Sequence, residues 1–269
     1  MENFKNPMEI FRLLDRSNCK KCNELTCLAF STQVFNGKRG LDECPKLPTD
    51  VIEKYGDHTS KQPGIEDNLA SIVDELRRRV SRLDFASAAE RVGGKSSDDS
   101  LTIKILGKDF SVDSEGKVYS DIHVHPWVTM PILSYLIDCK GVSPTGSWVP
   151  FRELKTGRIW YRLFKQRCEK PLKRIADTYT NLFEDMIHIF NGKQVADHYS
   201  SDISLVLHPL PKVPILISYW KPEDGLESDL NIFFDSTAEE QLNIEAIFGL
   251  GTGLVRMFEK IALRHGSGE

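Results

Sequence analysis

The stretch NCKKCNELTCLAFSTQVFNGKRGLDECP, residues 18–45, decides the organisation of this 269-residue chain. It contains four of the six cysteines, spaced Cys-x2-Cys-x4-Cys-x16-Cys, and a proline directly follows the last one. Thiols grouped in this way, in a chain without a sign of an oxidising compartment, are typical of a metal site rather than of disulfides. The four predicted metal ligands are Cys19, Cys22, Cys27 and Cys44.

Two kinds of metal site use such a set of thiolates, structural zinc sites and iron–sulfur clusters. The paired Cys-x2-Cys knuckles of structural zinc sites are missing here. A compact run of three cysteines plus a distant cysteine followed by Pro45 is closer to the ligation of a cluster. The spacing therefore favours a [4Fe–4S] cluster, with zinc as the alternative.

Residues 18–45 also resemble a known module, the small four-cysteine [4Fe–4S] domain of the corrinoid iron–sulfur protein large subunit and of Rnf-type electron-transport B subunits. The cysteine spacing matches, and so does the Thr26–Cys27 step followed by the aromatic Phe30. Asn23 stands where that family usually has glycine. Because asparagine tolerates left-handed backbone better than most residues, we expect the tight turn to survive.

Composition sets limits on the class of protein. The hydrophobic content of 40% and charged content of 28% are ordinary for a globular protein. A net charge of −4 offers no electrostatic case for binding nucleic acid. The N-terminus lacks an apolar run of signal-peptide length, and runs such as Val213–Trp220 are too short to span a bilayer. We expect a cytoplasmic protein without a membrane span, and the cluster suggests an anaerobic host.

Capping and breaker residues predict two domains. A helix begins at Asn6 and Pro7, and a second short helix covers Leu28–Phe35. Residues 46–63 are polar and contain prolines near both ends, which favours a linker. We therefore predict a cluster domain over residues 1–60 and a second domain over residues 61–269.

The second region predicts an α+β domain with a mostly antiparallel sheet, because its strands and helices are partly segregated along the chain. A proline is expected to separate two of its helices, and three glycines are expected to weaken the last one. The predicted strands are Leu101–Leu106, Phe110–Val112, Ser204–Leu207, Pro214–Trp220 and Leu230–Phe234, and the predicted helices include Val128–Cys139, Arg158–Cys168, Pro171–Phe190 and Ile244–Arg264.

Four strings in this region, ILGKDF, WVPFREL, PLPKVPILISYW and NIFFDSTA, resemble the family DUF3786. The resemblance runs from about residue 65 to the C-terminus and implies a domain boundary but no activity. The family usually has a more acidic string after the tryptophan, whereas here Trp220 is followed by Lys-Pro-Glu-Asp-Gly-Leu.

Few residues of the second region suggest chemistry. His123 and His125 are two positions apart, so in an extended segment both imidazoles face one side and could ligate a metal or a tetrapyrrole-type cofactor such as cobalamin. Ordinary loop histidines are the alternative. Arg152 and Glu153 predict a structural ion pair. Cys139 and Cys168 are expected to be buried as small apolar residues.

Three functions fit these observations. The chain is predicted to transfer single low-potential electrons from its cluster to a redox partner protein or to a cofactor held by the second domain. The alternative, implied by the resemblance to the corrinoid iron–sulfur protein, is a cobalamin-binding protein of C1 transfer, or a protein that keeps a corrinoid protein reduced. A structural cluster in an interaction module is the third.

Overall fold

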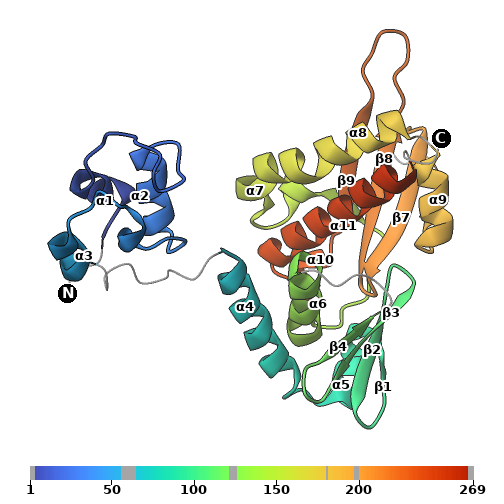
Figure 1. Cartoon of the computed structure of the whole chain (residues 1–269). Helices are drawn as coiled ribbons and strands as arrows, with labels where there is room; N and C mark the ends of the chain where they lie inside the picture. Colours follow the sequence, from blue (N-terminus) through green and yellow to red (C-terminus); the bar gives the residue numbers. More distant parts are fainter. Residues whose placement is uncertain (1–3, 56–64, 121–125, 180, 197–199, 266–269) are drawn as a thin grey trace. The chain divides into compact units, whose positions relative to one another are not determined.

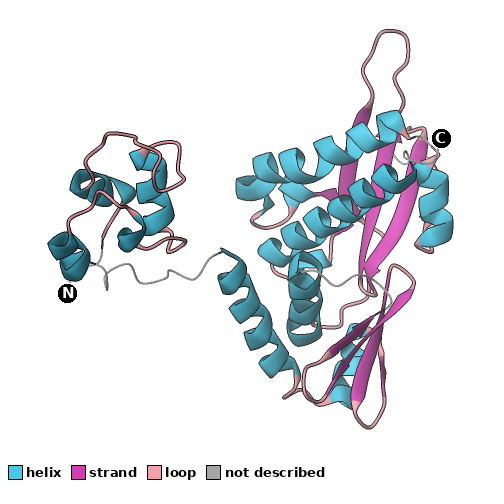
Figure 2. Ribbon diagram, viewed as in Figure 1, coloured by secondary structure: helices cyan, strands magenta, loops and turns pink. Residues whose placement is uncertain are grey.

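The computed structural model describes residues 4–55, 65–120, 126–179, 181–196 and 200–265. These residues form two compact units, Met1–Ser71 and Ile72–Glu269. Helices and antiparallel strands confirm the predicted α+β class, with a small helical unit ahead of the unit that contains the sheets (Figure 1, Figure 2). The boundary predicted at residues 60 and 61 lies outside the described residues and stays a prediction. Within the described residues, no helix is both long and apolar enough to cross a membrane.

The first unit is built from short helices around a small core. Asn6 caps the first of them by accepting a hydrogen bond from the backbone N–H of Met8 at 3.0 Å, as the sequence predicts. The elements are α1 (Pro7–Leu13), α2 (Cys27–Phe35), the 3-10 turn η1 (Leu41–Glu43) and α3 (Thr49–Tyr55). The buried side chains of this core are Ile10, Leu14, Cys27, Phe30, Val34, Leu41, Cys44 and Leu47.

The predicted linker over residues 46–63 is wrong for its first half. Helix α3 occupies part of it, and Val51, Ile52 and Tyr55 pack against the core of the first unit. The ring of Tyr55 lies 5.6 Å from that of Phe4. These three apolar residues recur at helical spacing, which indicates a helix. The linker prediction gave more weight to Pro48 and Pro63 than to this spacing. The rest of the predicted linker, from residue 56, lies outside the described residues.

The second unit contains a small sheet with strand order β1-β2-β3-β4, in which every described pairing is antiparallel. The strands predicted over Leu101–Leu106 and Phe110–Val112 are confirmed and pair as a hairpin, with Ile103 opposite Phe110. Its turn uses positive φ at Leu106 and Gly107, the conformation that suits a two-residue hairpin. The elements here are α4 (Ile65–Val80), α5 (Phe85–Val92), β1 (Lys95–Ser96), β2 (Ser100–Ile105), β3 (Lys108–Asp113) and β4 (Val118–Ser120).

The larger sheet has strand order β5-β9-β8-β7-β6 and is also antiparallel, which confirms the three long strands predicted. Ile217 and Tyr219 of β8 join the main core beneath the helices, whereas Leu216 belongs to a small cluster with Val206 and Phe233. This alternation is the period of two of a strand. The strands are β5 (Trp148–Pro150), β6 (Lys193–Gln194), β7 (Ile203–Leu210), β8 (Val213–Trp220) and β9 (Asp229–Asp235).

Helices cover one face of this sheet (Figure 1). The predicted break at Pro171 is wrong, because the chain stays helical from Gly157 to Thr178 through a π-helical segment, Lys165–Glu169. Proline is tolerated at this position because it lies in the first turn of the helix that follows the π-helical segment. The remaining elements are α6 (Pro126–Asp138), the 3-10 turn η3 (Phe151–Glu153), α7 (Gly157–Phe164), η4 (the π-helical segment), α8 (Lys170–Thr178), α9 (Leu182–Ile189), α10 (Ala238–Gln241) and α11 (Ile244–His265).

Helix α11 runs unbroken through the glycines that were expected to weaken it. A Cβ atom at Gly251 would lie 2.9 Å from the Phe164 ring and 3.4 Å from the Cys168 sulfur, so a side chain there would collide with the ring and touch the sulfur. The glycine therefore permits close contact with the helices α7 and η4. Tertiary packing outweighs the low helix propensity of glycine here.

Candidate metal centre and polar pocket

The loop that carries the first two cysteines has an unusual backbone. Arg16, Asn18, Lys20 and Asn23 all have positive φ, between 48° and 61°. Left-handed conformations at residues other than glycine are costly and persist where the surrounding structure fixes them. Loops of this kind turn successive backbone N–H groups toward an anion, as in many iron–sulfur sites. The left-handed turn expected at Asn23 is confirmed.

The third cysteine begins a helix. Cys27 is the first residue of α2, and Thr26 caps that helix by accepting a hydrogen bond from the backbone N–H of Ala29 at 3.0 Å. The backbone N–H of Cys27 donates to Asn18 Oδ1 at 2.7 Å, which fixes the left-handed loop to the helix. The positive end of the helix dipole favours a thiolate at this position.

Arg39 joins the loop of the early cysteines to the turn before Cys44. Its Nη1 donates to the backbone carbonyl of Cys22 at 2.7 Å and pairs with Glu43 at 3.0 Å, while its Nε lies 3.5 Å from Glu24. Arg39 therefore has a structural function, because its contacts hold the loop of the early cysteines to the turn before Cys44.

Lys46 makes a second connection of the same kind. Its Nζ lies 2.7 Å from Asp15 Oδ2 and donates to Ser17 Oγ at 2.9 Å, which joins the chain after Cys44 to the chain before Cys19. The hydrogen bond from Lys46, together with those from Ser17, lowers the pKa of Asp15 to about 2. The ion pair is therefore present throughout the neutral range.

The four thiols share one neighbourhood. Cys27 and Cys44 are buried, and Cys19 and Cys22 are half-buried. Burial raises the pKa of the Cys44 thiol, the proximity of the three other thiols raises it further, and a backbone hydrogen bond from Lys46 acts in the opposite direction. A hydrogen bond from the backbone N–H of Lys21 lowers the pKa of the Cys19 thiol.

As they stand, the described residues contain no group of three or more His, Cys, Asp or Glu side chains arranged to hold a metal ion. Ligation by Cys19, Cys22, Cys27 and Cys44 therefore stays a prediction. The donor set fits a cluster in its chemistry, since it offers thiols with backbone N–H donors at two of them.

The structure describes four of the other residues that the sequence singled out. His123 and His125 lie outside the described residues. Cys139 and Cys168 are buried, as expected, and burial raises the pKa of the Cys168 thiol to about 12. Arg152 and Glu153 approach to 4.0 Å, but both side chains are exposed, so this pair contributes little to stability.

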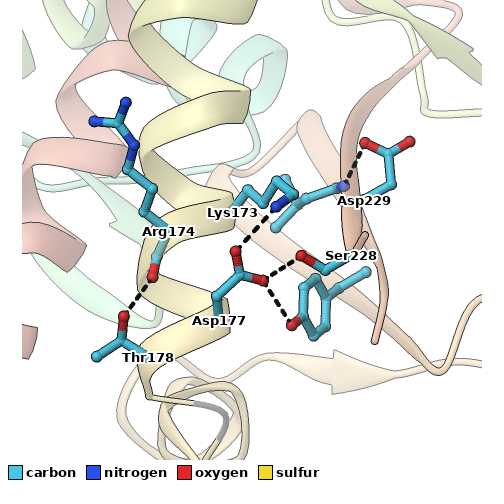
Figure 3. Close-up of polar contacts among 8 residues, drawn as sticks. Lys173, Arg174, Asp177, Thr178, Ser228 and Asp229 are labelled. Atoms are coloured by element: carbon cyan, nitrogen blue, oxygen red, sulfur yellow. Dashed lines mark hydrogen bonds and ion pairs between the residues drawn. The ribbon is translucent and has the colours of Figure 1, made fainter. Parts of the chain in front are cut away.

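The second unit contains a polar site that the sequence did not reveal. Asp177 on α8 accepts hydrogen bonds from Tyr219 Oη at 2.9 Å and Ser228 Oγ at 2.5 Å, and Lys173 Nζ lies 3.0 Å from its other oxygen (Figure 3). Burial raises the pKa of the Asp177 carboxyl, but these three hydrogen bonds together outweigh it and leave the pKa below its ordinary value.

A pocket of about 690 Å³ opens beside this carboxylate. Tyr219 is buried, whereas the residues that follow β8 are exposed. The residues that contribute come from α8, from the N-cap of α9, from the end of β8 and from both sides of the loop that joins β8 to β9. They are Lys173, Asp177, Asn181, Tyr219, Lys221, Pro222, Glu227 and Ser228.

Comparison with known families separates the chain into the same two regions. Residues 14–46 match the family "Putative Fe-S cluster", and residues 84–257 match "Domain of unknown function (DUF3786)". Both resemblances predicted from the sequence are thereby confirmed. No solved structure matches the chain.

Among curated proteins, the acetyl-CoA decarbonylase/synthase complex subunit gamma of Methanothermobacter thermautotrophicus is 45% identical over 69 residues, which is 26% of this chain and 13% of that subunit. The corrinoid/iron-sulfur protein large subunit of Moorella thermoacetica is 45% identical over 38 residues, 14% of this chain and 8% of that protein. The chain therefore spans a small fraction of the length of these relatives.

Proposed function

Since this chain belongs to the DUF3786 family and carries a four-cysteine segment that matches an Fe–S family, we propose that it is an iron–sulfur electron-transfer protein. Residues 1–60 form the cluster domain in this proposal, and residues 61–269 hold the acceptor or its docking surface. The observation that carries the proposal is the left-handed loop around Cys19 and Cys22, tied to the other two cysteines by Asn18, Arg39 and Lys46.

When bound, a [4Fe–4S] cluster supplies one-electron redox chemistry. In the proposed site Cys19, Cys22, Cys27 and Cys44 hold it. The residues of this chain contribute orientation and charge compensation: the backbone N–H groups of Lys21 and Lys46 donate to thiols, and Lys46 carries a positive charge near Cys19 and Cys27. Hydrogen bonds and nearby cations of this kind favour the reduced, more negative state of a cluster.

The exposed surface beside the cysteines fits a protein partner. Leu25 and Leu28 are 75% and 45% exposed and lie on either side of Cys27 in the sequence, and the side chains of Lys20 and Lys21 are exposed as well. Apolar residues bordered by lysines favour a redox protein whose contact surface is acidic. Reversal of charge in Lys21→Glu should slow reduction of an acidic carrier and weaken its salt dependence, and unchanged rates would argue against this surface.

The test of the cluster is iron analysis after anaerobic purification. We expect about four irons per chain, because each cubane cluster has four. Cys22→Ser should lose most of the iron, while the matched control Cys168→Ser, a buried thiol of the second unit, should keep it. Stoichiometric zinc without iron in the reconstituted protein would falsify the proposal.

A redox titration separates electron transfer from a structural role. The visible absorption of the cluster should bleach and recover reversibly on reduction and reoxidation, and a physiological carrier should exchange electrons with it. A cluster that decomposes on reduction, or that no carrier can reduce, would support the structural alternative.

A second candidate is corrinoid chemistry, favoured by the similarity to the corrinoid/iron-sulfur protein large subunit of Moorella thermoacetica. In this alternative the second domain binds cobalamin, or docks a corrinoid protein, and His123 or His125 provides an axial ligand. The test is to add cobalamin, remove the free ligand and record visible spectra of His123→Ala and His125→Ala, with the exposed His188 replaced as a control. Absence of retained corrinoid in the wild type would exclude direct binding.

A further inference from the structure

The pocket beside Asp177 differs in kind from an apolar cofactor site. Of the residues that line it, only Pro222 is without a polar side chain, and the Tyr219 and Ser228 hydroxyls both donate to Asp177. The volume of about 690 Å³ is within the range of small-molecule sites. A site of this composition suits a hydrophilic ligand, since burying apolar surface against it would leave polar groups unpaired.

The Asp177 carboxylate is not available to a ligand. One of its oxygens accepts hydrogen bonds from both Tyr219 and Ser228, and the other pairs with Lys173 (Figure 3). The charge of Asp177 is therefore compensated inside the protein. The same contacts fix Lys173 at the side of the pocket, where its ammonium group retains two further N–H donors.

Lys221 lines the same pocket, but its side chain takes no part in the hydrogen bonds around Asp177. Its backbone N–H donates to Asp202 Oδ2 at 2.7 Å, which fixes the chain at the end of β8. Within the described residues, its ammonium group has no hydrogen-bond or ion-pair partner. Glu227 lies on the other side of the hairpin. Because Lys173 pairs with Asp177, the pocket offers a ligand the Lys221 ammonium group as a contact for an anion and the Glu227 carboxylate as an acceptor for a hydroxyl or amino group.

The hairpin that forms one wall is well defined. Asp224 and Gly225 both have positive φ, and Glu223 pairs with Leu226 across the tip, where the Leu226 N–H donates to the Glu223 carbonyl at 2.8 Å. This is the geometry of a two-residue hairpin turn, which holds the flanking strands in one register. Lys221 and Glu227 are thus held at the two sides of the hairpin.

We propose that the pocket between α8 and the β8–β9 hairpin binds a small hydrophilic oxyanion, a carboxylate or a phosphate that also carries a hydroxyl group. Lys221 and Lys173 contact the anionic group, and Glu227 and Asn181 accept from the hydroxyl. The proposal is independent of the cluster, because each residue that carries it belongs to the second unit.

The test is calorimetric titration of the full-length protein at low ionic strength with two probes, inorganic phosphate and L-malate. We expect saturable binding of at least one probe at a single site. Phosphate alone identifies a phosphate site, and malate alone identifies a carboxylate site. If neither probe binds saturably, the proposal is wrong.

Lys221→Met is the decisive variant, because the Lys221 ammonium group takes no part in the Asp177 network. Loss of a charged hydrogen-bond donor should weaken binding about tenfold or more. Lys170→Met, an exposed lysine on the same helix as Lys173 but outside the pocket, is the matched control and should bind as the wild type does. Equal weakening in both variants would indicate general surface charge and overturn the proposal.

Discussion

The two units of this protein stabilise their polar groups in opposite ways. In the second unit the polar cluster at Asp177 is satisfied by the protein itself, above a continuous core of helices on a sheet. In the first unit the core is small, two of its buried residues are the cysteines Cys27 and Cys44, and the neighbouring loop is held in left-handed conformations. Small units of this size usually need a metal or a disulfide to remain folded. From this comparison we predict that the first unit needs a bound metal to stay folded and that the second unit stays folded without one.

Removal of the iron should produce the largest difference in folding between the two units. If the first unit depends on the cluster, treatment with a chelator under oxidising conditions should unfold it as a whole, because metal binding and folding are coupled. Limited proteolysis should then digest the first unit and leave a stable fragment that begins near Ile65. Digestion of both units at equal rates would contradict the difference between them, and an intact first unit after loss of iron would contradict the dependence.

In the described part of the second unit, three buried side-chain atoms lack a hydrogen-bond partner: Arg77 Nε, Ser218 Oγ and Oε2 of Glu169. The acidic residue among them is Glu169. This residue is 3% exposed, and its Oε2 has no hydrogen-bond partner among the described residues. Burial raises its pKa to about 7 from 4.5, so the folded state favours the protonated carboxyl. The stability from this preference is complete below pH 4.5 and is lost as the pH rises through about 7.

Glu169→Gln should therefore stabilise the second unit at pH 8, by about 3 kcal/mol at most, and have little effect near pH 4.5. Urea unfolding at the two pH values measures this. Glu259→Gln, at an exposed position of α11, is the control and should show no such pH-dependent gain. A loss of stability at pH 8 in Glu169→Gln would indicate that the carboxylate has a partner outside the described residues.

In the first unit, Asn18 combines a left-handed backbone with a hydrogen bond to the N–H of Cys27. Asn18→Ala removes the acceptor and strains the backbone, and should cost about 1–2 kcal/mol. Asn18→Gly removes the acceptor alone, because glycine adopts positive φ freely, and should cost less. The rate of iron loss to a chelator reports both variants. Equal rates in alanine and glycine variants would show that the backbone conformation of residue 18 is unimportant.

Features that depend on residues close together in the sequence were the ones that could be predicted. The four cysteines and their caps lie within 30 residues of one another, so spacing alone identified the proposed ligands, and three strands of the larger sheet, β7, β8 and β9, were visible as apolar runs. The left-handed conformation at Asn23 followed from the resemblance, which places a glycine at this position, and from the tolerance of asparagine for positive φ.

Contacts between distant residues were beyond that reasoning. Asp177 meets Tyr219 and Ser228 across separations of 42 and 51 residues, and each of these residues lies in an ordinary pattern for a helix or a strand end. Pro171 and Gly251 misled the prediction for a related reason, because their local propensities were overridden by a π-helical segment and by close helix packing. Helix α3 was missed because its apolar face is short and it lies directly between Pro48 and Gly56.

Tyr219→Phe is the most specific test of the Asp177 network. The substitution keeps the buried ring, which stacks on Phe183 at 5.5 Å, and removes only the hydroxyl that donates to Asp177. Loss of one buried hydrogen bond to a charged acceptor should cost about 1–2 kcal/mol at pH 7. Tyr179→Phe, at an exposed position next to α8, should cost little and serves as the control.

The pH dependence of Tyr219→Phe shows whether the hydroxyl acts as the structure indicates. Burial, together with the hydrogen bond to Asp177, raises the pKa of Tyr219 to about 12, so the protonated phenol stabilises the wild type below pH 10. That stability is lost as the pH rises from about 10 to about 12. The variant should lack this alkaline loss, which urea unfolding between pH 9 and pH 11 measures. An identical alkaline loss in wild type and variant would mean that another group titrates there and that the Tyr219–Asp177 contact is not part of the native network.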